Sequence, residues 1–283
     1  MHEVLDWYQS NKRDLPWRNS DPWGVLVSEF MLQQTPVQRV LPQWQRWLEL
    51  WPTPEDLAAA PLSAALREWG RLGYPRRAKR LHQCAQIIVN EHGGKVPTAL
   101  DELRNLPGVG EYTAAAILAF AYSKSEVLLD VNIRRLYARC WNGISSPATK
   151  GGPNNAERNL AAGLIPEGDD GTWAAATMEL GALICKARNP ICERCPLARI
   201  CLWRALDYPE THNATRSKQG AQWHGSDRQC RGVIMKALRE SHQVTMAQLA
   251  KVWSDASQYE KAIASLLDDG LIKKRGTYYS LAD

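Results

Sequence analysis

A single acidic residue, Glu29, interrupts the apolar stretch VSEFMLQQ at residues 27–34. Val25, Leu26 and Leu32 lie at helical spacing from Glu29, so a helix here would place the carboxyl group among apolar side chains. Burial disfavours the charged form of a carboxyl group, which responds by raising its pKa and keeping its proton. Glu29 is therefore a candidate general acid, and the alternative is a structural ion pair with an arginine.

A second candidate acid is Asp130, in the segment LLDVNIRRLYARC. It follows three apolar residues and precedes a helical pattern, which is the position of a helix N-cap. Capping does not exclude chemistry, because backbone N–H groups fix a capping carboxylate and keep it ionised. One protonated and one ionised carboxyl group are what cleavage through an oxocarbenium-like transition state requires.

Four of the seven cysteines lie in one short loop, residues 185–201: Cys185, Cys192, Cys195 and Cys201. Four thiolates at this spacing can close around a metal centre. Zinc is the alternative, but zinc sites usually consist of two cysteine pairs with a longer stretch between them. The single continuous loop favours one 4Fe–4S cluster. An odd number of cysteines argues against a disulfide framework, and the remaining three, at positions 84, 140 and 230, are expected to be buried structural thiols.

A glycine-containing turn, LPGVGEYTAAAIL at residues 106–118, joins a predicted helix that ends at Leu106 to one that begins near Glu111. Gly108, Val109 and Gly110 would leave backbone N–H groups uncovered at the N-terminus of the second helix. This arrangement can bind an anion such as a DNA phosphate, and the alternative is an ordinary turn between helices.

Composition and patterning predict two domains. Residues 1–206 show helical patterns with few strand signals, and residues 207–226 are polar and read as a linker. Residues 227–283 predict three helices and a hairpin turning at Arg275–Gly276, as in winged-helix folds, which bind either DNA or proteins. The expected fold is mainly α with a small α/β C-terminal domain.

The charge and hydropathy of the chain indicate whether nucleic acids or membranes are expected as partners. The net charge of +5 suits a polyanion without requiring one. No run of about 18 apolar residues is present, so no membrane span is expected. The first residues lack the pattern of a signal peptide, and we expect a cytoplasmic protein.

Residues 1 to about 205 resemble the helix-hairpin-helix (HhH-GPD) DNA glycosylases, and among them the MutY-type adenine glycosylases. The resemblance runs in order through LPWR, SEFMLQQT, LGYPRRAKRL, LPGVGEYTAAAIL, LDVNIRRLYARC, MELGALIC and the four-cysteine loop. It implies an enzyme, expected to be a monomer, that binds double-stranded DNA containing a mispair. Such an enzyme flips out adenine paired with 8-oxoguanine or guanine, cleaves its glycosidic bond and leaves an abasic site.

The resemblance also assigns roles to individual residues. Glu29 matches the acid that protonates adenine at N7, and Asp130 matches the carboxylate that stabilises the sugar cation. Tyr112 stands where related lyases have a lysine, so at most weak lyase activity is expected. Substrate contacts are implied for Leu15, Trp17, Arg18, Gln33, Gln34, Thr35, Tyr74, Tyr112, Asn132 and Glu179. Among these, Gln33 and Gln34 match residues placed at the lesion, Tyr74 matches a tyrosine that stacks beside the oxidised base, and Glu179 could equally form a helix-face salt bridge.

The basic residues after Tyr74, at positions 76, 77, 79 and 80, could neutralise phosphates or form a solvated helix face. Two departures from the family pattern stand out: Pro75 replaces a tyrosine common after Tyr74, and no Nudix-like C-terminal domain follows. The alternatives are a thymine or uracil mismatch glycosylase of the same superfamily, which would lack Glu29, and a non-catalytic DNA-binding iron–sulfur regulator. The regulator reading leaves the Glu29 and Asp130 pair unexplained.

Overall fold

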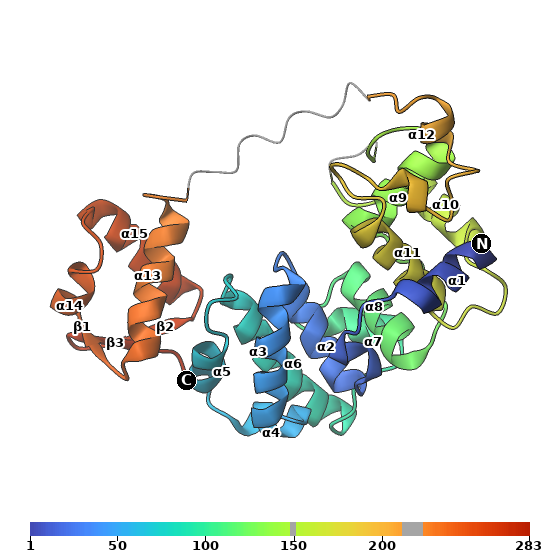
Figure 1. The fold of residues 1–283 in the computed structure, drawn as a ribbon. Coiled ribbons are helices and arrows are strands. Elements are labelled where there is room, and N and C mark those ends of the chain that lie inside the picture. Colours follow the sequence, from blue (N-terminus) through green and yellow to red (C-terminus); the bar gives the residue numbers. More distant parts are fainter. Residues whose placement is uncertain (148–150, 211–222) are drawn as a thin grey trace. The chain divides into compact units, whose positions relative to one another are not determined.

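The computed structural model describes residues 1–147, 151–210 and 223–283, which form two compact units. Among the described residues, the first unit takes in 1–25, 98–104 and 109–210. The second takes in 26–97, 105–108 and 223–283. Helices dominate both units (Figure 1), and among the described residues strands occur only in one small sheet near the C-terminus. The expected mainly α fold is confirmed.

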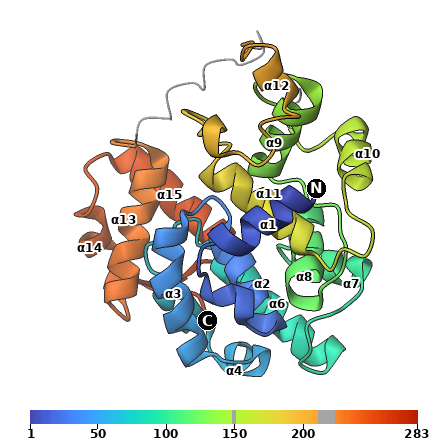
Figure 2. The same cartoon turned by 45° about the vertical axis from the view of Figure 1, so that its right-hand side comes forward.

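The first unit is a helical bundle around a single apolar core. Its elements are α1 (His2–Asn11), η1 (Pro16–Asn19), most of α7 (Leu100–Asn105), α8 (Glu111–Tyr122), α9 (Val131–Asn142), α10 (Asn155–Gly163), α11 (Thr172–Leu183), η2 (Cys192–Arg194) and α12 (Leu202–Ala205). Helices α9 and α11 pack side by side, as both views show (Figure 2). Between them Trp173 donates its indole N–H to the hydroxyl oxygen of Tyr137 at 2.9 Å, which satisfies the polar end of a buried ring.

The second unit combines the middle of the helical region with the C-terminal segment. It contains most of α2 (Pro22–Leu32), α3 (Val37–Leu50), α4 (Pro54–Ala59), α5 (Leu62–Glu68) and α6 (Arg76–His92). Thr53 and Asp56 form a capping box that starts α4, and Gly93, with φ of 59°, ends α6. Two fully buried tryptophans, Trp47 and Trp69, pack edge to face with ring centroids 5.6 Å apart.

The C-terminal segment, residues 223–283, which we call the C-terminal domain, contains the three helices and the hairpin that the sequence predicts, and its winged-helix-like character is still a prediction. Its elements are α13 (Asp227–Glu240), β1 (Val244–Thr245), α14 (Met246–Ala250), α15 (Ala256–Asp268), β2 (Ile272–Arg275) and β3 (Tyr278–Leu281). The strands pair antiparallel in the order β1-β3-β2, and Gly276, with φ of 59°, turns the hairpin. Residues 211–222 of the predicted linker lie outside the described residues.

The described helices give no candidate for a membrane span, because none combines the necessary length with an apolar composition.

Candidate functional site

Glu29 lies on α2, a helix that is apolar on nearly every side. Its side chain is 8% exposed, and its neighbours Phe30 and Met31 are fully buried. A carboxyl group in such surroundings is costly to ionise. The predicted burial of Glu29 among apolar side chains is confirmed, and its role as a general acid is still a prediction.

Arg77 on α6 holds the segment that follows Glu29. Its guanidinium group is buried and donates to the carbonyl oxygens of Phe30 and Met31, both at 3.0 Å, and to that of Gln33. It also donates to the Thr35 hydroxyl at 3.0 Å. These acceptors lie at and beyond the C-terminal end of α2, where helix carbonyls lack partners within the helix. Burial lowers the pKa of Arg77 to about 10, which leaves it charged at neutral pH.

The same guanidinium group fixes the loop that carries Tyr74. It donates to the carbonyl oxygens of Leu72 and Gly73 at 3.2 and 3.1 Å. The sequence left phosphate binding and a solvated helix face open for Arg77, but its side chain is buried and its hydrogen bonds connect SEFMLQQT to LGYPRR. The long sequence separation of its partners, up to 47 residues, explains why the sequence did not reveal this.

Two of the residues matched to the lesion have strained backbones. Gln34 has φ of 56° and Tyr74 has φ of 48°, in the left-handed region that residues with a Cβ seldom adopt. Both side chains are exposed, whereas Gln33 is half-buried and Thr35 is buried. Strain of this kind persists where the surroundings impose it, and it is common in functional sites. Gln33, Gln34 and Tyr74 therefore form a polar and aromatic surface beside α2, and the buried side chains of Thr35 and Arg77 lie beneath it.

Asp130 caps α9 with both of its carboxylate oxygens engaged. One oxygen accepts the backbone N–H groups of Asn132 and Ile133 at 2.9 and 2.7 Å, and the other accepts the Asn132 side-chain amide at 2.7 Å. Burial raises the pKa of Asp130, and these hydrogen bonds together with the charge of Arg135 oppose the increase. The predicted cap is present, and it fixes the carboxylate in one orientation.

A chain of hydrogen bonds runs from Asp130 to the cysteine loop. The side-chain amide oxygen of Asn132 accepts from Arg135 at 2.9 Å, and Arg135 also donates to the backbone carbonyl oxygen of Cys185 at 2.8 Å. Arg135 also reaches the carbonyl of Gly181 at 2.8 Å. The close approach of α11 to Asn132 needs glycine at position 181, because an added Cβ there would lie 2.8 Å from the Asn132 side chain. The two segments that carry the candidate carboxylate and the candidate metal ligand are therefore rigidly linked.

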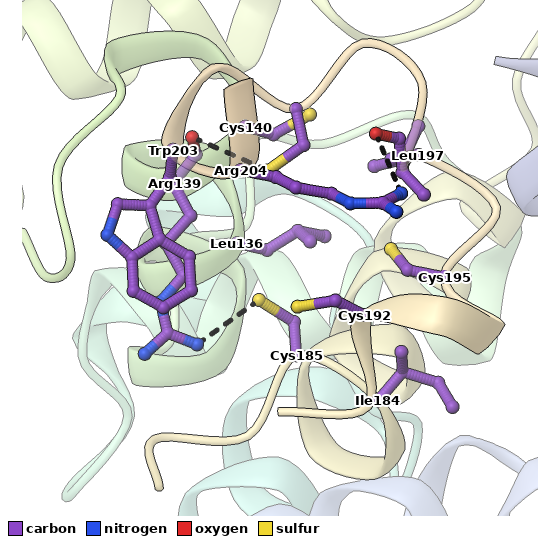
Figure 3. A pocket seen from close by; sticks show the side chains of 12 residues that line it. Leu136, Arg139, Cys140, Ile184, Cys185, Cys192, Cys195, Leu197, Trp203 and Arg204 are labelled. Atoms are coloured by element: carbon purple, nitrogen blue, oxygen red, sulfur yellow. Dashed lines mark hydrogen bonds between the residues drawn. The ribbon is translucent and has the colours of Figure 1, made fainter. Parts of the chain in front are cut away.

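The four loop cysteines surround one pocket (Figure 3). Cys185 follows α11, Cys192 begins η2, Cys195 follows η2 and Cys201 precedes α12. No three His, Cys, Asp or Glu side chains in the described part of the chain are close enough together to hold one metal ion. Around a single zinc the thiolate sulfurs would be only about 3.8 Å apart, given Zn–S bonds of about 2.3 Å. A cubane cluster binds its four thiolates at separate corners, so four described cysteines that are not grouped closely enough for a single ion fit an iron–sulfur cluster better than zinc.

The side chains around this pocket act differently on the individual thiols: burial raises the pKa of Cys192, and that of Cys195 to about 11. Arg139 is buried, donates to the Cys185 sulfur at 3.5 Å and lies 4.3 Å from the ring centroid of Trp203 (Figure 3). A hydrogen bond from the Cys140 thiol lowers the pKa of Cys201 to about 6. Cys140 is buried, as expected, but it also lines the pocket, which its place in a helical pattern did not indicate.

Glu179 on α11 is almost fully buried and engages two arginines. Arg13 donates both from its side chain, at 2.9 and 2.6 Å, and from its backbone N–H at 2.8 Å, and Arg18 donates at 3.1 Å. Burial alone would raise the pKa of Glu179, but the bonds from Arg13 and the charge of Arg18 lower it below its usual value. The salt-bridge alternative is present, and it ties the segment containing buried Leu15 and Trp17 to α11.

The glycine turn lies between α7 and α8, as predicted. Gly108 has φ of 87°, and Gly110 is the N-cap of α8, which has no side-chain capping hydrogen bond. An added Cβ at Gly110 would meet nothing within 4 Å, so the backbone at the start of α8 is open. Tyr112 is half-buried in the first turn of α8.

Known families match both the region that contains Glu29 and Asp130 and the four-cysteine loop. Residues 27–159 match the HhH-GPD superfamily of base excision DNA repair proteins, and residues 185–201 match the iron–sulfur binding domain of endonuclease III. The structure of a thermostable thymine-DNA glycosylase is 28% identical, with a TM-score of 0.65 over 72% of this chain and 94% of that one. An endonuclease III–DNA complex shares the fold, with a TM-score of 0.62 at 22% identity over 73% of this chain and 94% of that one.

Curated relatives extend the match over almost the whole chain. The adenine DNA glycosylase of Mycolicibacterium smegmatis is 46% identical, over 96% of this chain and 92% of its own length. That of Mycobacterium tuberculosis is 44% identical, over 96% of this chain and 89% of its own length. The human adenine DNA glycosylase is 36% identical over 77% of this chain, but this match covers only 42% of the human protein. The chain therefore belongs to the adenine DNA glycosylases, DNA-binding repair hydrolases that act on N-glycosyl bonds and carry a 4Fe–4S cluster.

Proposed function

We propose that this enzyme removes adenine paired with 8-oxoguanine or guanine from double-stranded DNA. The observation that carries the proposal is the contrast between two carboxyl groups. Glu29 is 8% exposed on an apolar helix, whereas Asp130 accepts three hydrogen bonds that oppose the rise in its pKa caused by burial. A carboxylic acid and a carboxylate in different environments are the two groups that glycosidic cleavage needs.

In the proposed reaction the adenine is flipped out of the duplex, and Glu29 gives its proton to N7 of the base. The bond between the sugar and the base then breaks, and the bonding electrons stay with the protonated adenine. The charge of Asp130 stabilises the developing sugar cation. Water adds to this cation and loses a proton, which leaves an abasic site. Tyr112 offers no amine for a Schiff base, so the reaction stops there.

Two surfaces would position the substrate. The polar and aromatic surface around Gln33, Gln34, Thr35 and Tyr74 would occupy the space beside the base opposite the adenine, and its strained backbones support such a role. The open N-terminus of α8 at Gly108–Gly110 would bind a backbone phosphate through its N–H groups. Residues near the segment held by Glu179, namely Leu15, Trp17 and Arg18, would line the adenine pocket, with Asn132 beside Asp130.

The cluster would be held by Cys185, Cys192, Cys195 and Cys201, whose sulfurs surround one pocket next to two arginines. Bound there, it would fold the loop into one shape and add local charge. Because Arg135 bonds both the Cys185 carbonyl and the Asn132 side chain, an ordered loop would also hold Asn132 and Asp130 in place.

We also infer that the enzyme acts as a monomer on DNA in the cytoplasm, associated with the nucleoid. The basic net charge of +5 supports association with a polyanion.

A second candidate is removal of thymine or uracil from mispairs with guanine, favoured by the 28% identity to a thymine-DNA glycosylase. One assay separates the two: base release from duplexes with A opposite 8-oxoguanine, A opposite guanine, T opposite guanine and U opposite guanine. We expect free adenine from the first two duplexes and no base from the others. Release of thymine or uracil without adenine would refute the proposal.

A further inference from the structure

The buried carboxylate of Asp269, just after α15, joins the C-terminal domain to α6. Its side chain is 2% exposed and forms ion pairs with Arg76, in the first turn of α6, and with Arg231 on α13. Lys79 on α6 donates to the backbone oxygen of Asp269 at 2.7 Å. Because a buried carboxylate is costly without partners, separating the domain from α6 would leave Asp269 with fewer of them. These contacts favour the docked domain, and they engage Arg76 and Lys79, for which the sequence suggested phosphate binding.

Two further features, one on α5 and one in the C-terminal domain, support the contact between this domain and the helices α5 and α6. Arg67 on α5 donates to the carbonyl oxygens of Leu238 and Arg239 at 3.2 and 2.6 Å, and so caps the C-terminal end of α13. Gly270, with φ of 60°, lies under Lys79, where an added Cβ would come within 2.5 Å of the lysine Nζ. Helices α5 and α6 therefore hold the C-terminal domain at separate points.

Docking brings the first turn of α13 to the exposed ring of Tyr74. The Arg228 guanidinium carbon lies 5.7 Å from the centroid of this ring, and that of Arg77 lies 5.6 Å from it. Both distances are within the range of cation–π attraction. The ring is 45% exposed on a backbone with φ of 48°, so Tyr74 is held out toward solvent by its surroundings. Arg77 belongs to the helical scaffold, whereas Arg228 belongs to the C-terminal domain.

We propose that Arg228 is a positioning residue for Tyr74, through which the docked C-terminal domain adjusts the enzyme's response to the base opposite the adenine. This inference rests on the proposed function, in which Tyr74 stacks beside that base. The cation of Arg228 restricts the orientations of the ring before DNA binds, which reduces the ordering needed in the complex. Asp269 acts indirectly: its ion pairs hold α13 in the position from which Arg228 can reach the ring.

The test compares Arg228→Ala, Arg228→Lys and Asp269→Asn in the full-length protein. Single-turnover adenine release at saturating enzyme is measured for A opposite 8-oxoguanine and for A opposite guanine. Binding of uncleavable analogues of both duplexes provides a readout that does not need catalysis. We expect Arg228→Ala to reduce the ratio of the release rates for A opposite 8-oxoguanine and A opposite guanine by about two- to fivefold. This is the size of one exposed cation–π contact. Lysine at this position should restore most of the preference, since it keeps the cation.

Lys236→Ala is the matched control, because Lys236 lies on the same helix and forms an ion pair with Glu240 on its exposed face. It should leave the preference unchanged. Asp269→Asn should reproduce the loss, and combining it with Arg228→Ala should add nothing further, because both changes remove one contact. An Arg228→Ala enzyme whose preference in release and binding equals that of the wild type would overturn the inference. If the wild type released no adenine, the proposed function would fail, and the binding ratios would still decide the role of Arg228.

Discussion

Replacing Asp130 by Asn separates its capping role from its proposed chemical role. Asn is as good an N-cap as Asp, so its side-chain oxygen can keep the hydrogen bonds from the N–H groups of Asn132 and Ile133. The variant loses only the bond from the Asn132 amide to the second oxygen, about 1 kcal/mol. It also loses the negative charge. Removing one group that stabilises charge in a transition state typically lowers the rate by about 10²–10³-fold.

We therefore expect Asp130→Asn to unfold with a free energy lower by about 1 kcal/mol, and to release adenine about 10²–10³-fold more slowly. Single-turnover kinetics and urea unfolding measure the two effects. Asp255→Asn is the matched control, because Asp255 caps α15 through the N–H of Gln258 at 2.9 Å, in the C-terminal domain. It should leave the rate unchanged. If Asp130→Asn retained a wild-type rate, Asp130 would be a helix cap and nothing more.

Three other substitutions and one strand-cleavage assay test separate parts of the proposed mechanism. Cys192→Ser should lose iron and the broad absorbance near 400 nm that is expected of iron–sulfur sites, whereas a colourless wild type with one zinc would contradict the cluster assignment. Arg135→Lys should keep its iron but release adenine about tenfold more slowly, because it loses one hydrogen bond that orients Asn132. An unchanged rate would show that Arg135 does not connect the cysteine loop to Asp130. Glu179→Gln should flatten the acid side of the stability–pH profile. The pKa of Glu179 is lowered on folding, so its contribution is present above the unfolded pKa and is lost as the pH falls through the folded value. Because Tyr112 is not a lysine, strand cleavage should follow adenine release only after alkali treatment, and strong cleavage without alkali would show a lyase.

Local patterns predicted the features of the site that depend on nearby residues. The apolar helix around Glu29, the cap at Asp130 and the four-cysteine loop each occupy a short stretch of sequence. Their environments follow from helical periodicity, capping rules and ligand spacing. Their chemical roles came from the family resemblance and are still predictions.

Contacts between distant segments could not be predicted in this way. Glu179 meets Arg13 across 166 residues, and Arg76 meets Asp269 across 193 residues. Nothing in a basic helix face indicates whether its charges bind phosphates or a carboxylate of another domain. The left-handed backbone of Tyr74 was equally hidden, because tyrosine does not favour that conformation and the surrounding hydrogen bonds impose it. Strand β1 was missed because two residues are too short for an alternating pattern.

The central claim, that Glu29 is the acid, is tested most directly by Glu29→Gln. Glutamine keeps the shape of the side chain in its apolar surroundings but has no acidic proton to donate. The measurement is single-turnover adenine release from a duplex with A opposite 8-oxoguanine, together with the affinity of the same protein for that duplex. We expect that release is abolished while affinity stays close to that of the wild type. A Glu29→Gln enzyme that released adenine at a near-normal rate would contradict this expectation.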